Sequence, residues 1–168
     1  MIFLIGYRGT GKTTVARLLA ERLGWNWFDA DAVLEERHQR HIIEIFALDG
    51  EAAFRDMESV VLAELCNLSR HVIATGGGVV LRDENCARMR DAGRIVWLTA
   101  DVETIWTRLQ ADAAAGRDRP ALTVGGRAEI EELIRVREPL YRACADLCVA
   151  TDRRTPEEVV EEIASAGS

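Results

Sequence analysis

The stretch Gly6-Tyr7-Arg8-Gly9-Thr10-Gly11-Lys12-Thr13 decides the fold, because it matches the P-loop pattern G-x-x-x-x-G-K-[ST]. It follows a short apolar run at residues 1–5, which predicts a buried strand, and precedes residues 14–23, where apolar side chains recur at helical spacing. A chain of this length shows the full pattern by accident less than about one time in a hundred. The sequence therefore predicts a nucleoside triphosphate site between a strand and a helix.

The chemistry of this loop follows from its residue types. Glycines let the backbone turn tightly so that its N–H groups face phosphate oxygens, and the positive end of the following helix adds its dipole. Lys12 would neutralise charge on the β- and γ-phosphates, and the Thr13 hydroxyl would ligate Mg²⁺. The alternative is a chance glycine turn with an exposed lysine, which the flanking strand and helix disfavour.

Composition limits the classes of protein to consider. The chain of 168 residues suits a single domain, and its 48% apolar and 29% charged residues are ordinary for a globular enzyme. A net charge of −7 disfavours nucleic acid as a partner. No segment resembles a signal peptide or reaches membrane-spanning length, so we expect no membrane partner and a cytoplasmic location. Its four cysteines lack zinc-type spacing, which predicts reduced thiols.

Apolar segments alternate with helical segments along the chain, and five of them predict strands, at residues 1–5, 25–28, 71–75, 95–98 and 147–149. Asp49-Gly50 would separate two helices, and Pro139 would kink or interrupt the long helix that begins near residue 128. Thr155 to Glu158 predicts a capping box, with Pro156 at the first helical position. This alternation indicates an α/β protein, a three-layer P-loop fold with a five-stranded parallel sheet flanked by helices.

Two carboxylates, Asp29 and Asp31, follow the second predicted strand. Residues i and i+2 of an extended segment point to the same side, so both carboxylates would face one space beyond the carboxyl ends of the strands. There one carboxylate could hold a Mg²⁺-bound water and the other could engage an acceptor hydroxyl. An alternative of equal weight is a solvated loop, in which Asp31 only caps the helix that begins near Ala32.

An arginine and three glycines mark the middle of the chain. Arg55 lies four residues after Glu51 and three before Glu58, so a carboxylate can hold it from either side of a helix. A surface ion-pair ladder explains this spacing equally well. Residues 76–78 are glycines at the end of a predicted strand, where the missing Cβ atoms permit close approach to a ligand. A flexible turn is the alternative.

Residues 112–124 are rich in small and charged side chains, and they form the one segment that we expect to be mobile. In a phosphotransferase such a segment suits a lid, which excludes water as it closes and brings an arginine to the phosphates. Arg117 and Arg119 are the candidates for that arginine.

The chain resembles the shikimate kinase family along nearly its whole length. The resemblance rests on a set of motifs in family order and at family-like spacing: Phe28-Asp29-Ala30-Asp31, Ile45-Phe46, Gly50-Glu51-x-x-Phe54-Arg55-x-x-Glu58, Ala74-Thr75-Gly76-Gly77-Gly78, Arg119-Pro120, Arg137-x-Pro139-Leu140-Tyr141 and Thr151-x-x-Arg154-x-Pro156. It implies transfer of the γ-phosphate of ATP to the 3-hydroxyl of shikimate, a step in making aromatic amino acids. It also implies a nucleoside-monophosphate-kinase-like fold, with a shikimate-binding subdomain at about residues 32–60 and a mobile lid.

The same resemblance implies roles for residues around ATP. The phosphates would be lined by Gly11, Lys12, Thr13, Thr14, Val15 and Ala16. Mg²⁺ would be held by Thr13 directly and by Asp29 through water. Arg119, immediately before the lid proline, would bind ATP phosphate and steady the transferring group. Arg154 would lie near the adenine, with Arg153 as the competing candidate.

On the acceptor side, the resemblance implies that Arg55 and Arg137 clamp the shikimate carboxylate. Glu58 would orient Arg55, and the backbone near Gly77 would touch the substrate. Asp31 would hydrogen-bond the ring hydroxyls and is the candidate for accepting the proton of the attacking one. The catalytic residues would then be Lys12, Asp31 and Arg119 of a monomeric enzyme.

Three other functions are compatible with a P-loop. A kinase of another small polyol acid or of a nucleotide shares the P-loop and size, but the set Asp31, Arg55 and Arg137 disfavours it. A GTPase would carry an Asn-Lys-x-Asp guanine signature, which the sequence lacks. A non-catalytic ATP-binding module would have lost Lys12, Asp31 or the lid arginine, and all three are present.

One departure from the family is Ala121, because the family usually has two leucines after the lid proline. This departure bears on lid closure rather than on the reaction.

Overall fold

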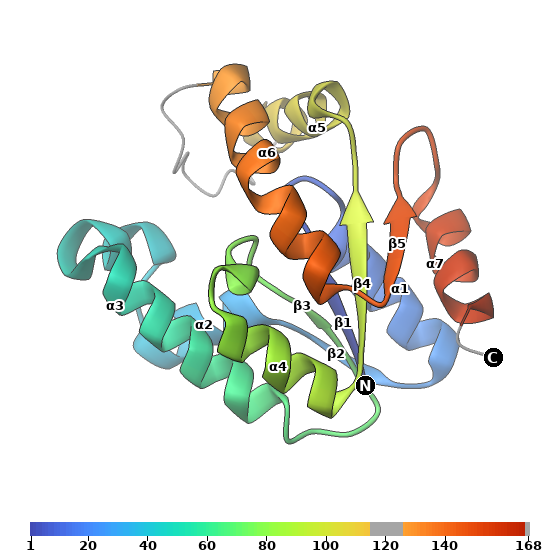
Figure 1. Cartoon of the computed structure of the whole chain (residues 1–168), viewed down its shortest axis with the longest axis horizontal. Coiled ribbons are helices and arrows are strands. Elements are labelled where there is room, and N and C mark those ends of the chain that lie inside the picture. Colours follow the sequence, from blue (N-terminus) through green and yellow to red (C-terminus); the bar gives the residue numbers. More distant parts are fainter. Residues whose placement is uncertain (115–125, 167–168) are drawn as a thin grey trace.

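A computed structural model describes residues 1–114 and 126–166 of the chain. Its centre is a parallel sheet of five strands in the order β2-β3-β1-β4-β5 (Figure 1). The strands are short and mostly apolar, as expected where both faces of a sheet are covered: β1 (Ile2–Ile5), β2 (Asn26–Asp29), β3 (His71–Ala74), β4 (Arg94–Thr99) and β5 (Leu147–Ala150). The predicted α/β class and five-stranded parallel sheet are therefore confirmed.

Helices cover both faces of this sheet and extend beyond one edge (Figure 1). They are α1 (Lys12–Leu23), α2 (Ala30–His38), α3 (Ile42–Leu65), the short 3₁₀ helix η1 (Val79–Leu81), α4 (Asp83–Ala92), α5 (Val102–Ala114), α6 (Gly126–Cys144) and α7 (Pro156–Ser165). None of the helices in the described ranges 1–114 and 126–166 combines the length and apolarity needed to cross a membrane.

The alternation of side chains along the strands divides the core into two layers. Phe3, Ile73 and Ile95 point to the face covered by α2, α3, α4 and α6, and all are fully buried. Leu4 and Val96 point to the opposite face, where α1 and α7 pack against them. Burying both faces makes the sheet a rigid platform, so the loops at its carboxyl edge are held in fixed relative positions.

A third, smaller apolar cluster joins α5 and α6 to the P-loop. Tyr7 from the P-loop packs with Ile105 of α5 and Ile130 of α6, and all three side chains are at most 4% exposed. This cluster lies beyond the carboxyl ends of the strands, where α5 and the first turns of α6 project in Figure 1. It ties the two helices that flank the proposed lid to the nucleotide loop.

Helix α2 begins at Ala30 rather than near Ala32, because Asp29 and not Asp31 caps it. The break predicted at Asp49-Gly50 is confirmed: Gly50 has non-helical dihedral angles (φ 84°, ψ 171°) and divides α3 into two helical stretches that meet at a kink. Helix α6 runs through Pro139 as one element, so Pro139 does not interrupt it. The capping box of Thr155 and Glu158 at α7 is confirmed.

Candidate active site

The P-loop leaves the carboxyl end of β1, the central strand of the sheet. From β1 the chain goes to β2 at one edge, returns to β3 beside β1, and then adds β4 and β5 on the other side. The connections on the two sides of β1 therefore diverge above it, which creates the crevice where open α/β sheets bind ligands. The geometry of the sheet thus puts the predicted triphosphate loop at the expected binding edge.

Within the loop, Lys12 is folded back onto the backbone. Its Nζ donates to the carbonyl oxygens of Gly6 at 2.8 Å and Tyr7 at 2.9 Å. Gly11 precedes α1 with a left-handed φ of 90°, so the helix N-terminus faces the loop interior. A cation and a helix N-terminus at one point are suited to bind a phosphate group.

The next residues of α1 divide by exposure. Thr14 is exposed, whereas the side chains of Val15 and Ala16 are buried in the core layer between α1 and the sheet. The N–H of Val15 already donates to the Gly11 carbonyl at 2.9 Å. Val15 and Ala16 therefore support the helix N-terminus from within the core, and their side chains do not reach a ligand.

A hydroxyl and a carboxylate meet at the end of the P-loop. Thr13 Oγ1 donates to Asp29 Oδ2 at 2.7 Å, and the other carboxylate oxygen accepts from the backbone N–H groups of Asp31 and Ala32. Hydroxyl and carboxylate oxygens are the ligands that Mg²⁺ prefers, so these residues fit a magnesium ion. Within the described part of the chain, no group of three or more His, Cys, Asp or Glu side chains forms a cluster suited to a metal.

Asp29 and Asp31 lie in a strand and a helix rather than in one extended segment. Asp29 ends β2 and faces Thr13, whereas Asp31 lies in the first turn of α2. The Asp31 carboxylate instead approaches Gly76: its Oδ1 would lie 2.7 Å from a Cβ added there. The extended spacing fails because the helix begins between the two residues. The alternative in which Asp31 only caps α2 is also excluded, since Asp29 is the cap.

Around residues 76–78, charged side chains from three helices converge on glycine backbone. A Cβ at Gly76 would meet Glu58 Oε1 at 2.6 Å, and a Cβ at Gly78 would overlap the Arg55 guanidinium at 2.3–2.4 Å. Near Gly77 the contact is looser, with Arg137 Nη1 at 3.8 Å from the added Cβ. Gly76 and Gly78 therefore leave room for the charged side chains of this cluster, and close approach of a ligand to the glycine backbone stays a prediction.

Arg55 is held from several sides. Its guanidinium donates to Glu58 at 2.8 Å and to Glu51 at 3.3 Å, and it stacks over the Phe54 ring at 4.9 Å. The side chains of Arg55 and Glu58 are only 12% and 5% exposed, so a surface ion-pair ladder does not describe them. Buried pairs of this kind carry a desolvation cost and are typical of binding sites more than of stabilising surface contacts.

Two atoms of this pair have no hydrogen-bond partner among the residues described, Arg55 Nε and Glu58 Oε1. Burial raises the pKa of Glu58, the charge and hydrogen bond of Arg55 oppose the rise, and Asp31 adds to it. A buried donor and a buried acceptor left unpaired cost about 1–3 kcal/mol each. A polar ligand that forms hydrogen bonds with these two atoms would remove this cost.

Sequence reasoning overlooked two residues that brace the site. The Tyr141 hydroxyl donates to the Gly77 carbonyl, which links α6 to the glycine loop. Arg108 of α5 donates to the Gly9 carbonyl at 3.2 Å and to Thr151 at 2.9 Å, which links the P-loop to the segment after β5. Tyr141 was part of a quoted motif but was given no role. For Arg108 the sequence held no signal, because it is one arginine among many on a helix.

The remaining predicted residues lie apart from this cluster or outside the described chain. Arg154 donates to the carbonyls of Ala150 and Glu158 and pairs with Glu162 at 2.5 Å, at the start of α7. Arg119, with Arg117 and Ala121, lies outside the described residues, as does most of the predicted lid at 112–124. The four cysteines are free thiols, as predicted.

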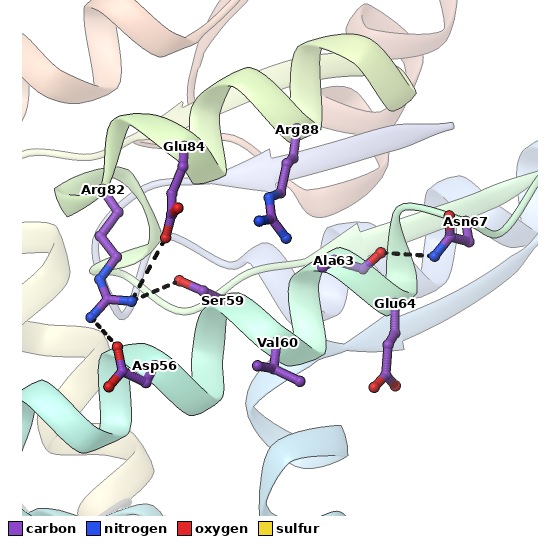
Figure 2. Close-up of a pocket in the computed structure, with 9 residues that line it drawn as sticks. All are labelled: Asp56, Ser59, Val60, Ala63, Glu64, Asn67, Arg82, Glu84 and Arg88. Atoms are coloured by element: carbon purple, nitrogen blue, oxygen red, sulfur yellow. Dashed lines mark hydrogen bonds and ion pairs between the residues drawn. The ribbon is translucent and has the colours of Figure 1, made fainter.

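A separate hollow of about 420 Å³ opens between α3 and α4, on the flank of the molecule (Figure 2). Arg82 spans it and contacts Asp56 at 2.6 Å, Ser59 at 3.3 Å and Glu84 at 3.8 Å. These carboxylates neutralise the arginine, and none of the predicted site residues lines the hollow. It is not part of the candidate active site.

Comparisons with known proteins all lead to one family. The family model described as Shikimate kinase matches residues 8–167. A shikimate kinase from Chromohalobacter salexigens is 45% identical over 163 residues, which cover 96% of this chain and 88% of the relative. A solved shikimate kinase from Acinetobacter baumannii, in complex with shikimate, has a TM-score of 0.89 at 33% identity, covering 98% and 90% of the two chains. Another, from Bacteroides thetaiotaomicron, has a TM-score of 0.87 at 31% identity, covering 98% and 96%.

Proposed function

Since the chain belongs to the shikimate kinase family, we propose that it transfers the γ-phosphate of ATP to the 3-hydroxyl of shikimate. The products are shikimate 3-phosphate and ADP, in the pathway to chorismate and the aromatic amino acids. The observation that carries the proposal is the convergence of Asp31, Arg55, Glu58 and Arg137 on the glycine loop, beside the P-loop. A site with two arginines, two carboxylates and unpaired polar atoms suits an acceptor with one carboxylate and several hydroxyls.

The acceptor is held by groups from three helices. Arg55 and Arg137 clamp its carboxylate, since guanidinium groups bind carboxylates through paired hydrogen bonds. Glu58 orients Arg55, to which it is hydrogen-bonded at 2.8 Å. Asp31 accepts hydrogen bonds from the ring hydroxyls, and the backbone at Gly77 contacts the ring. The Gly76 and Gly78 positions supply the room that these charged side chains need.

The donor occupies the P-loop. Gly11 through Ala16 lie along the phosphates at the start of α1, where the first N–H groups of the helix face the ligand, and Lys12 leaves the carbonyls of Gly6 and Tyr7 to neutralise phosphate charge. Thr13 and Asp29 would hold Mg²⁺, Asp29 through water, and the ion would neutralise phosphate charge. Arg154 lies near the adenine, and Arg119 binds ATP phosphate from the lid at residues 112–124.

Catalysis consists mainly of alignment and charge neutralisation. Phosphoryl transfer asks little covalent chemistry of a protein, so fixing the acceptor hydroxyl in line with the γ-phosphate supplies most of the rate. Lys12 and Arg119 stabilise negative charge on the transferring group. Asp31 orients the attacking hydroxyl and takes its proton as the new O–P bond forms. The two halves of the site meet at the glycine loop, where the Arg8 N–H lies 3.7 Å from a Cβ added to Gly77.

The proposal extends to the organisation of the chain. We propose one kinase domain at residues 1–168, in which residues 32–60 form the acceptor-binding subdomain and 112–124 the lid. A monomer in the cytoplasm is part of the same proposal; free thiols at all four cysteines support a reducing compartment.

The test is ADP production from ATP and Mg²⁺, with and without shikimate, with gluconate and nucleoside monophosphates as parallel acceptors. We expect ADP formation that depends on shikimate alone. Turnover with another acceptor would retain the P-loop roles but contradict the assignment of Arg55 and Arg137. No turnover with any acceptor, in protein that still binds ATP, would support a non-catalytic module instead.

A further inference from the structure

Tyr141 lies one helical turn after Arg137 on α6, and its side chain is 1% exposed. Its hydroxyl donates a hydrogen bond to the carbonyl of Gly77, 64 residues away in the sequence. Gly77 is also the point that the Arg137 guanidinium approaches, with Nη1 at 3.8 Å from a Cβ added there. Arg137 and Tyr141 therefore face the same peptide unit of the glycine loop from one face of one helix.

The Tyr141 ring is held in place by contacts in the core. It stacks on Trp97 of β4 with ring centroids 5.8 Å apart and planes 22° apart. Arg142 covers the Trp97 ring with its guanidinium carbon at 5.4 Å from the centroid. Because β4 lies inside the sheet and its side chains are buried on both faces, the ring and its hydroxyl have little freedom to move.

The hydroxyl can serve two partners at once. A phenol has one hydrogen to donate, which the Gly77 carbonyl accepts, and lone pairs that accept from a guanidinium N–H. Burial raises the pKa of Tyr141 to about 12, and Arg137 opposes the rise through its charge and a hydrogen bond to the side chain. The phenol therefore stays protonated and remains a donor near neutral pH.

We propose that Tyr141 is a positioning residue for the acceptor site, whose hydroxyl holds both the Arg137 guanidinium and the Gly77 carbonyl in their binding positions. The proposal rests on the proposed function, which gives Arg137 and Gly77 to the acceptor. Tyr141 itself does not touch the acceptor, because its hydroxyl is enclosed between α6 and the glycine loop. Through it, the rigid core at β4 fixes the direction in which a long, otherwise adaptable arginine points.

The chain contains one other tyrosine, and the comparison shows that burial alone does not dictate such a bond. Tyr7 is 4% exposed, and its hydroxyl has no partner among the described residues. Its ring packs in the apolar cluster between α5 and α6. The chain therefore accommodates a buried phenol without a hydrogen bond, so burial does not by itself account for the bond between Tyr141 and Gly77.

The first experiment replaces the hydroxyl and keeps the ring, with Tyr141→Phe. Loss of one buried hydrogen bond should raise the KM for shikimate about tenfold. The KM for ATP and kcat should stay within about twofold, because the hydroxyl that is removed bonds to the glycine loop and not to the P-loop. Thr75→Val is the matched control, since the Thr75 hydroxyl also donates to a backbone carbonyl, that of Leu4 at 3.0 Å. Both variants should lose similar thermal stability, and only Tyr141→Phe should lose acceptor affinity.

A double-mutant cycle with Arg137→Ala then separates positioning from general stability. If Tyr141 acts through Arg137, Tyr141→Phe should change the shikimate KM far less in the Arg137→Ala background than in the wild type. Equal effects in both backgrounds, or an unchanged KM in Tyr141→Phe alone, would overturn the inference and leave the proposed function intact. An unchanged shikimate KM in Arg137→Ala itself would contradict the proposed carboxylate clamp and, with it, the inference.

Discussion

The two halves of the site are built in different ways. The phosphate half is residues 6–13, and its key contacts are local: Lys12 reaches carbonyls five and six residues away. The acceptor half brings together Asp31, Arg55, Glu58, Gly76–Gly78 and Arg137, from α2, α3, the loop after β3 and α6. One half is therefore a property of a short segment, and the other is a property of the whole fold.

This difference predicts how each half responds to change. The phosphate half uses backbone groups and one cation at a helix end, so a substitution there removes charge but leaves the packing of the core alone. In the acceptor half, a buried ion pair lies against glycine backbone with no spare room. A substitution there displaces side chains from other helices and loops, and each displacement disturbs further contacts in the acceptor half.

The largest expected effect lies in the phosphate half. Lys12→Ala removes the cation assigned to the γ-phosphate, and turnover should fall by about 10²–10³-fold, as for loss of one preorganised charge donor. Shikimate affinity and the unfolding midpoint should remain close to those of the wild type, because Lys12 lies in the P-loop, where its Nζ donates to the carbonyls of Gly6 and Tyr7. Steady-state kinetics, acceptor titration and thermal unfolding measure these three quantities.

Lys12→Arg serves as the control for this prediction, since it keeps the positive charge but changes its shape. It should retain more turnover than Lys12→Ala. Near-normal turnover in folded Lys12→Ala would contradict the assignment of Lys12. A large loss of acceptor affinity would show that the two halves are coupled more tightly than their contacts indicate.

The next effect tests the crowding of the acceptor half, through Gly78→Ala. The added methyl would overlap the Arg55 guanidinium at 2.3–2.4 Å, so this flexible end must shift away from its binding position. We expect the shikimate KM to rise about tenfold, with a smaller effect on stability, because the backbone at Gly78 has φ −101° and accepts alanine. Kinetics at saturating ATP provide the measurement.

Gly77→Ala is the matched comparison, one residue away. A Cβ there meets nothing closer than the Gly6 carbonyl at 3.5 Å, an ordinary contact. Its effect on the shikimate KM should therefore be clearly smaller than that of Gly78→Ala. The reverse order would mean that direct backbone contact with the acceptor, rather than room for Arg55, is what the glycines provide.

The same contrast explains what the sequence could predict. Apolar runs and the P-loop pattern are local signals, so the strands, the parallel sheet and the place of Lys12 followed from them. The direction of Asp31 did not, because it depends on the residue at which α2 begins, and Asp29 caps that helix. The contacts of Arg55 with Gly78 and of Tyr141 with Gly77 join segments far apart in the chain. Only tertiary packing creates them, and local spacing carries no signal for it.

The smallest expected effect is a pH dependence in the acceptor half, carried by Glu58. Burial raises its pKa in the folded protein, where Arg55, Asp31 and Arg137 face it. A carboxyl whose folded pKa lies above its unfolded value contributes stability that is fully present below the unfolded pKa. That contribution is lost as the pH rises through the folded pKa.

Glu58→Gln isolates this contribution, because glutamine keeps the shape of the side chain and does not titrate. The free energy of unfolding, from urea titrations between about pH 4 and pH 8, should fall for the wild type relative to Glu58→Gln as the pH rises. The opposite trend would mean that the Arg55 charge outweighs burial and that Glu58 is held ionised by its partner. The buried ion pair of Arg55 and Glu58 would then raise the free energy of unfolding rather than lower it.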